Sequence, residues 1–226
     1  MIWGGPSLVP MGGTLNPSNY SFGINQGLNL TGGFASPGNY SIEMKFNFAN
    51  LDGWQKIIDF KNQSADEGLY DYWNKLQFVV QSGFGFETAV NDGFVSNQDV
   101  RLILTRDASS KQVVGYLAGI EQISFIDTTN QALFSGTNKV AYFLVDEGLG
   151  GEASIGSIDY LRIYDAPVTA SQAACLDTGS PVTCGLAGIP EPNTITLVLF
   201  GLTLIGLSKR QTSAHLKIKR FMGAHG

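Results

Sequence analysis

Carboxylate side chains gather around a glycine-rich stretch late in the sequence. Asp146, Glu147 and Glu152 flank it, and Asp59 ends another apolar run that reads as a β-strand. Hard cations such as Ca²⁺ take several oxygen ligands from carboxylates and backbone carbonyls. These four residues are therefore candidate calcium ligands, and calcium is the cofactor that they indicate. Solvated carboxylates at the rim of a β-sheet are an equally open interpretation, and no EF-hand spacing is present.

Aromatic side chains are concentrated in the sequence YDYW. Tyr70, Tyr72 and Trp73 lie in or near a predicted loop, with polar Asp71 and Asn74 beside them. Exposed aromatic rings next to polar groups can stack on sugar rings, so the three aromatic residues are candidate sugar-binding residues. Because Tyr70 and Tyr72 alternate, they also fit strand residues that face a core.

The sequence argues against the common types of hydrolytic site. Both histidines, His215 and His225, lie close to the C-terminus, which leaves the preceding chain without a Ser-His-Asp triad or a His-ligated zinc site. Glycosidases need two facing carboxyl groups, but no strand carries alternating acids, and Asp159 and Asp165 are six residues apart. We therefore expect no catalytic residues and a protein that is not an enzyme.

The two cysteines, Cys175 and Cys184, are close in sequence. The intervening LDTGSPVT contains turn-forming residues that can bring the two thiols together. A disulfide is expected if the protein is exported, and two free thiols are expected if it is not.

Charge is distributed unevenly along the chain. Of the 14 basic residues five follow Leu207, whereas all 19 acidic residues precede it. An acidic body does not suit a phosphate backbone, so we expect no nucleic-acid partner.

The body of the chain reads as antiparallel β-structure. In YSIEMKFNF (residues 40–48), apolar and polar residues alternate with the period of two that indicates a strand buried on one face and exposed on the other. Turn-forming sequences separate further strand candidates at short intervals, which favours a sandwich or jelly roll. These candidates are residues 54–60, 75–81, 84–90, 99–106, 112–119, 121–127, 140–146 and 158–165.

A short helix is expected after the last of these strands. Thr169 and Gln172 have the spacing of a capping box that opens a helix. We place the end of the body at residue 176 and a linker of turn-forming residues at 177–189.

The segment after the linker is apolar and ends in basic residues. Pro190 and Pro192 precede an apolar stretch over residues 194–207, and Lys209 and Arg210 follow it. As a helix this stretch reaches roughly 21 Å, which is short for the ~30 Å membrane core. Its lack of a polar face and the basic stop nevertheless favour a segment in the inner membrane over a buried core helix. Residues 211–226 form a basic tail.

This C-terminal pattern resembles the PEP-CTERM sorting signal of Gram-negative bacteria. The motif Pro190-Glu191-Pro192, the apolar helix and the basic pair Lys209 and Arg210 occur in the order of that signal. The resemblance spans residues 190–210 and implies recognition by an exosortase-type processing enzyme. It also implies export to the envelope or exterior, transient anchoring by the helix and a signal peptide upstream of Met1, because MIWGGPSLVP does not look like one.

The body, residues 1–176, resembles laminin-G-like, concanavalin A-like jelly-roll domains over roughly residues 20–176. The resemblance rests on sequences such as GWQKIIDFKNQSADEGLY and VRLILTRDASSKQVVGYLAG. It implies an all-β antiparallel jelly-roll sandwich, followed here by a C-terminal hydrophobic helix. Our first functional hypothesis is a non-enzymatic surface or extracellular-matrix protein that binds glycan, such as exopolysaccharide, or another surface component. The alternatives are a jelly-roll glucanase and a purely structural coat component.

Overall fold

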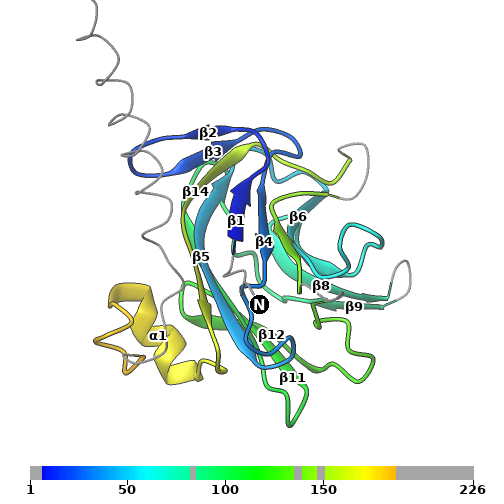
Figure 1. The fold of residues 1–226 in the computed structure, drawn as a ribbon, viewed down its shortest axis with the longest axis vertical. Helices are drawn as coiled ribbons and strands as arrows, with labels where there is room; N and C mark the ends of the chain where they lie inside the picture. The colour runs from blue at the N-terminus through cyan, green and yellow to red at the C-terminus, as the bar shows by residue number, and fades with distance from the viewer. Residues whose placement is uncertain (1–6, 82–84, 135–138, 147–150, 187–226) are drawn as a thin grey trace, which may run out of the picture. The chain divides into compact units, whose positions relative to one another are not determined.

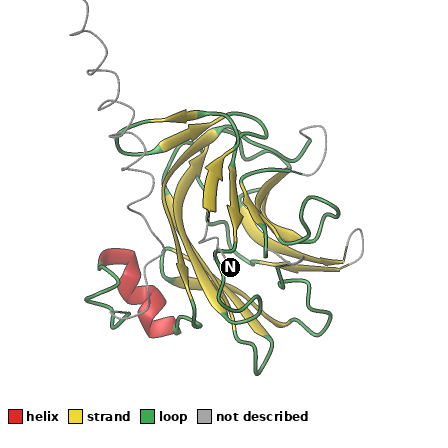
Figure 2. Cartoon of the chain, in the orientation of Figure 1, coloured by secondary structure: helices red, strands yellow, loops and turns green. Residues whose placement is uncertain are grey.

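The structure is a computed structural model that describes residues 7–81, 85–134, 139–146 and 151–186. All of these residues belong to one compact unit, Met1–Pro192. Within it, two antiparallel sheets of seven strands each pack face to face (Figures 1 and 2). This arrangement confirms the predicted all-β antiparallel sandwich. The PEP-CTERM segment, with its hydrophobic helix and basic tail, lies outside the described residues.

The strands of the first sheet follow a spatial order that differs from their sequence order. Strand β13 comes from late in the chain but pairs with both β4 and β6. Such non-sequential neighbours resemble those of a jelly roll. In spatial order the sheet contains β1 (Ser7–Pro10), β4 (Leu28–Thr31), β13 (Ala141–Phe143), β6 (Trp54–Asp59), β7 (Gly68–Tyr72), β8 (Lys75–Gln81) and β9 (Gly85–Thr88).

The second sheet is built around β5, which pairs with β10 on one side and β14 on the other. Strand β14 is the last of the described strands in sequence, yet it lies between β5 and the early strand β3. In spatial order the sheet contains β12 (Ile120–Ile126), β11 (Gln112–Leu117), β10 (Val100–Arg106), β5 (Tyr40–Phe48), β14 (Gly156–Tyr164), β3 (Tyr20–Phe22) and β2 (Thr14–Leu15).

The core lies between the inner faces of the two sheets and is rich in aromatic rings. As the alternation predicts, every second residue of β5 from Tyr40 to Phe48 is fully buried. Ring pairs such as Phe34 with Phe134 and Phe60 with Phe134 fill one end of the core, with centroids 4.0 and 4.6 Å apart. Rings of this size supply much of the hydrophobic free energy of a sandwich.

The expectation that the other face of β5 is exposed is wrong for two of its residues. Ser41 and Glu43 are fully buried. Polar partners cover this face: the Ser41 hydroxyl donates to the Ala166 carbonyl, and the Glu43 carboxylate accepts hydrogen bonds from the neighbouring strand β14. A satisfied polar residue can be buried at little net cost, so alternation marks a face without fixing its exposure.

Helix α1 (Ala170–Thr178) packs against the second sheet. The capping box expected at its start is present. The Gln172 backbone N–H donates to the Thr169 hydroxyl, and the Gln172 side-chain oxygen accepts from the Thr169 backbone N–H. The expected end of the body at residue 176 falls inside this helix. Cys184 and Leu186 are also buried against the sheet, so the packed body extends at least to residue 186.

Candidate functional site

Three aromatic side chains gather on the outer face of the first sheet, the face turned away from the core. Trp54 begins β6, and Tyr72, at the end of β7, is its direct cross-strand partner, with ring centroids 4.1 Å apart. Phe86 in β9 brings its ring to 5.6 Å from that of Trp54. We call Trp54, Tyr72 and Phe86 the aromatic platform.

The strand register explains why these rings share a face. Leu76 and Phe78 of β8 are fully buried in the core, so the alternate residue Gln77 points outward. Tyr70 in β7 is the direct cross-strand partner of Gln77, so its side chain lies on the same outer face. Two strands, β7 and β8, separate β6 from β9, yet the rings of Trp54 and Phe86 meet above the outer face of the sheet.

The platform remains accessible to a ligand. The Phe86 side chain is 44% exposed, and Trp54 and Tyr72 are partly exposed. Large flat rings that are open to solvent offer apolar surface with only two rotatable side-chain bonds to immobilise. Such a surface suits a ligand that presents a flat apolar face together with polar edges.

The three predicted sugar-binding residues occupy different environments. Tyr72 belongs to the platform. Tyr70 lies beneath it, 1% exposed, with its ring centroid 5.3 Å from Trp54, and its hydroxyl donates to the Asp66 carbonyl. Trp73 is 54% exposed in the β7–β8 turn, and its backbone N–H donates to the Gly53 carbonyl.

The sequence analysis missed Trp54 and Phe86. Trp54 stands two residues before Lys56, and Phe86 stands two before Thr88, so the period of two places each ring on the same strand face as a polar residue. Those signals give the face of each strand. They do not show that β6 and β9 bring their rings together.

Polar groups border the platform at the hydroxyl end of Tyr70. The buried Lys56 ammonium lies 4.8 Å from the centre of the Tyr70 ring and donates to the Asp66 carbonyl at 3.4 Å. The Lys56 amide donates to the Glu152 carbonyl. Burial first, and then the neighbouring Asp146 carboxylate, raise the pKa of Glu152.

Gln77 adds a buried polar atom to the same face. It is the direct cross-strand partner of Tyr70 and is 3% exposed. Its side-chain oxygen is buried and accepts no hydrogen bond from the described residues. A buried acceptor without a donor is costly, and such atoms are found where a ligand or water completes the site.

The candidate calcium ligands are held by the protein's own donors. One Asp59 oxygen accepts the amides of Lys61 and Gln63, and the other lies 3.7 Å from the Lys56 ammonium. The Asp146 carboxylate accepts the Glu152 amide at 3.3 Å. In the described part of the chain no group of three or more acidic, histidine or cysteine side chains could hold a metal ion. Glu147 lies outside that part, and calcium binding stays a prediction.

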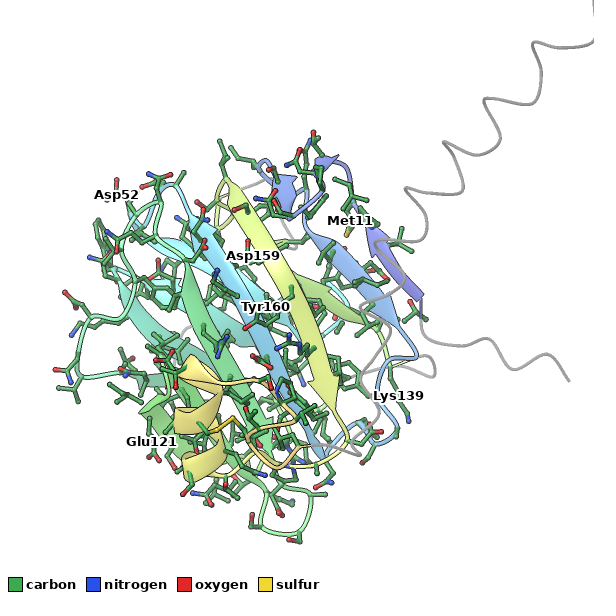
Figure 3. All side chains as sticks on the ribbon, turned by 90° about the vertical axis from the view of Figure 1, so that its left-hand side faces the viewer. Met11, Asp52, Glu121, Lys139, Asp159 and Tyr160 are labelled. Carbon is green, nitrogen blue, oxygen red and sulfur yellow. A yellow bond between two sulfur atoms is a disulfide. The ribbon has the colours of Figure 1, made fainter. Side chains whose placement is uncertain are left out.

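The outer face of the second sheet carries a different polar network. Buried Glu43 accepts hydrogen bonds from the Tyr160 and Tyr164 hydroxyls and from Arg162. Burial, followed by the Glu43 charge, raises the pKa of Tyr160 to about 12. Tyr160 and Asp159 face outward from β14 in Figure 3. With its acceptors occupied by donors from the same sheet, this network fits a structural role.

A groove of about 280 Å³ lies nearby and is lined in part by Lys45, Asp99, Arg101 and Asp177. Lys45 forms ion pairs with Asp99 at 3.0 Å and with Asp159 at 2.6 Å. These ion pairs neutralise the charge of Lys45, and the groove is lined by both acidic and basic side chains.

The expected disulfide between Cys175 and Cys184 is present. It joins α1 to the turn that follows and helps to hold both on the outer face of the second sheet (Figure 3). The predicted sorting-signal residues lie outside the described residues. No helix among the described residues is long and apolar enough to cross a membrane.

Comparisons with known proteins show the fold alone. No family model and no curated protein match the chain. The ligand binding domain of botulinum neurotoxin serotype D, solved with N-acetylneuraminic acid, has a TM-score of 0.58 at 13% identity, covering 76% of this chain and 45% of that one. Domain 4 of AbnA, an extracellular GH43 arabinanase from Geobacillus stearothermophilus solved with arabinotriose, has a TM-score of 0.52 at 20% identity, covering 76% and 88%.

A third similar structure is the Trypanosoma rangeli sialidase in complex with the inhibitor DANA. Its TM-score is 0.55 at 11% identity, covering 75% of this chain and 29% of the sialidase. This chain therefore spans less than half the length of the toxin and sialidase chains. The likeness places the body among β-sandwich domains.

Proposed function

We propose that the body is a non-enzymatic glycan-binding domain and that the aromatic platform is its binding surface. The observation that carries the proposal is the convergence of the Trp54, Tyr72 and Phe86 rings on one partly exposed face. Flat aromatic rings complement the C–H faces of sugar rings, and the polar groups beside Tyr70 complement sugar hydroxyls. The complexes of similarly folded domains with arabinotriose and N-acetylneuraminic acid support a glycan as the ligand class.

Substitution on the platform tests this proposal. We expect Phe86→Ala and Trp54→Ala each to weaken binding to a responsive glycan about tenfold or more, which corresponds to a loss of at least about 1.4 kcal/mol of stacking. The screen uses a glycan array that includes arabinotriose and N-acetylneuraminic acid, and titration calorimetry then measures the affinity. Incubation of the same glycans with the protein, followed by product analysis, should detect no cleavage.

The matched control is Ile120→Ala. Ile120 is 66% exposed at the start of β12, in the other sheet, so this variant removes exposed apolar surface away from the platform. Its affinity should equal that of the unmodified protein. Near-ultraviolet circular dichroism checks that each variant is folded. If folded Phe86→Ala and Trp54→Ala both bind with unchanged affinity, the platform is not the binding surface.

We also propose that the protein is exported and sorted to the bacterial surface through its C-terminal segment. The Cys175–Cys184 disulfide supports an oxidising compartment, because structural disulfides persist mainly outside the cytosol. The PEP motif, apolar stretch and basic pair support an exosortase-type enzyme and the inner membrane as partners. Intact mass of the protein from its native host tests this: a C-terminus near Pro190–Pro192 in the envelope or medium is expected. A chain ending at Gly226 in the cytosol contradicts it.

A further inference from the structure

We propose that the aromatic platform selects uncharged glycans over glycans that carry carboxylates, an inference that rests on the proposed function. The distribution of charge and hydrogen-bond acceptors around the platform carries this step. Aromatic rings by themselves accept charged and uncharged sugars alike, so the discrimination has to come from the groups that border them.

Acidic side chains outnumber basic ones beside the platform. Asp66, Asp146 and Glu152 meet near the hydroxyl end of Tyr70: the Asp66 carbonyl accepts from Lys56 and Tyr70, and the Asp146 carboxylate accepts the Glu152 backbone amide. Burial raises the pKa of Glu152, and repulsion from the Asp146 and Asp66 carboxylates raises it further. A carboxylate on a ligand here would add another negative charge to a partly desolvated cluster.

The cations of this region are already engaged. Lys56 is buried and lies 3.7 Å from the Asp59 carboxylate. Lys75, the cross-strand partner of Tyr72, donates to the Val90 carbonyl and lies 3.8 Å from Asp92. Strands β6 to β9 contain no arginine, the residue that binds carboxylates in a bidentate manner. On these strands an anionic sugar would therefore find no arginine, and only lysines that already lie beside carboxylates.

The same groups suit the hydroxyls of a neutral sugar. Carboxylates accept hydrogen bonds from O–H donors. Glu152 is half-buried and lies close enough to Tyr70 for the Tyr70 hydroxyl to lower the Glu152 pKa. Gln77, on the same face and 3% exposed, has a side-chain oxygen that accepts nothing from the described residues. Stacking rings beside a half-buried carboxylate and the Gln77 oxygen suit a polyhydroxylated ligand without negative charge.

Paired polysaccharides with one backbone and two charge states provide the test. Galacturonan and its fully methyl-esterified form are one such pair. A neutral glucan and the same glucan oxidised at C6 to the carboxylate are another. Affinity for each member is measured by affinity electrophoresis and calorimetry at about 20 and 300 mM NaCl. We expect the carboxylated member to bind at least tenfold more weakly at low salt, and the difference to shrink at high salt because exposed charges are screened.

Glu152→Gln identifies the source of the discrimination, and Glu121→Gln is its matched control. Glu121 is exposed on β12 in the other sheet. We expect E152Q to reduce the preference for the neutral member several-fold and E121Q to leave it unchanged. Equal or tighter binding of the carboxylated members overturns this inference and leaves the glycan-binding proposal intact. Failure of every glycan on the array and in the pairs to bind overturns both.

Discussion

The carboxyl group of Asp71 is buried on the inner face of the first sheet. Its cross-strand neighbours are Gln55 and the core residue Leu76, and both of its oxygens are enclosed without a well-aligned hydrogen-bond partner among the described residues. Burial, together with the charge of Asp92, raises its pKa to about 7. A carboxyl group in such a place is held more easily in its protonated form.

This position predicts a loss of stability as pH rises. Between the ordinary pKa of aspartate and about 7, the unfolded chain releases the Asp71 proton while the folded protein keeps it, so the free energy of unfolding decreases. Below that interval Asp71 is protonated in both states, and the full stability is present. Above it, burial of the charged Asp71 lowers the free energy of unfolding by on the order of 4 kcal/mol. Asp71→Asn should remove the penalty and raise stability at pH 8, as measured by urea unfolding at several pH values.

The control for Asp71→Asn is Asp52→Asn, which changes an exposed acid near the same strands. It should leave the pH dependence of unfolding as it is in the unmodified protein. Lower stability of Asp71→Asn at pH 8, with an unchanged pH slope, would show that the folded protein holds Asp71 in another way.

At the scale of elements, the β7–β8 hairpin combines an unfavourable backbone with an exposed aromatic residue. Tyr72 and Lys75 pair directly, so Trp73 and Asn74 form a two-residue turn, with φ angles of 49° and 69°. Turns of this kind favour Asn-Gly, because a bulky residue at positive φ is strained. Trp73 directly follows Tyr72 of the platform in sequence and is 54% exposed, so its ring is open to a ligand.

Replacing Trp73-Asn74 by Asn-Gly should separate stability from binding. The two substitutions relieve the strained turn, and we expect thermal or urea unfolding to show a gain of about 0.5–1 kcal/mol. If Trp73 contacts the ligand, calorimetry should show glycan affinity falling several-fold in the same variant. An increase in stability with unchanged affinity would remove Trp73 from the predicted sugar-binding residues.

At the scale of the whole body, the Cys175–Cys184 disulfide and α1 complete the packing of the second sheet. Leu176 and Leu186 are buried beside Ile103 and Tyr164 of β10 and β14. The disulfide closes a short loop, with the two cysteines nine positions apart in sequence. It thereby helps to hold α1 and the turn that follows it against β10 and β14.

Removal of this disulfide should destabilise the body without abolishing its fold. For a loop of this length, the loss of chain constraint corresponds to about 2–3 kcal/mol. We expect the Cys175→Ala/Cys184→Ala variant to unfold about 5–10 °C lower than the oxidised protein in calorimetric scans. Reductant should lower the Tm of the unmodified protein to that of the variant and leave the variant unchanged. An effect of reductant on the variant would point to another cause.

The sequence by itself determined the features that depend on neighbouring residues. The period of two in residues 40–48, the capping box at Thr169 and the turn between Cys175 and Cys184 each predicted what the structure contains. Interactions of this kind close over a few residues, so their signal is complete in the local pattern. The short early strands and β7, which carries an acid on its inner face, gave no such clear signal.

Only the tertiary structure decided which strands lie side by side, and with them the candidate site. The platform joins Trp54, Tyr72 and Phe86 from three strands, and β13 enters between β4 and β6 from far along the chain. Burial of Glu43 likewise depends on donors from β14. Alternation tells which face of a strand a residue occupies, but sheet order and register are set by packing the whole core, which no local pattern contains.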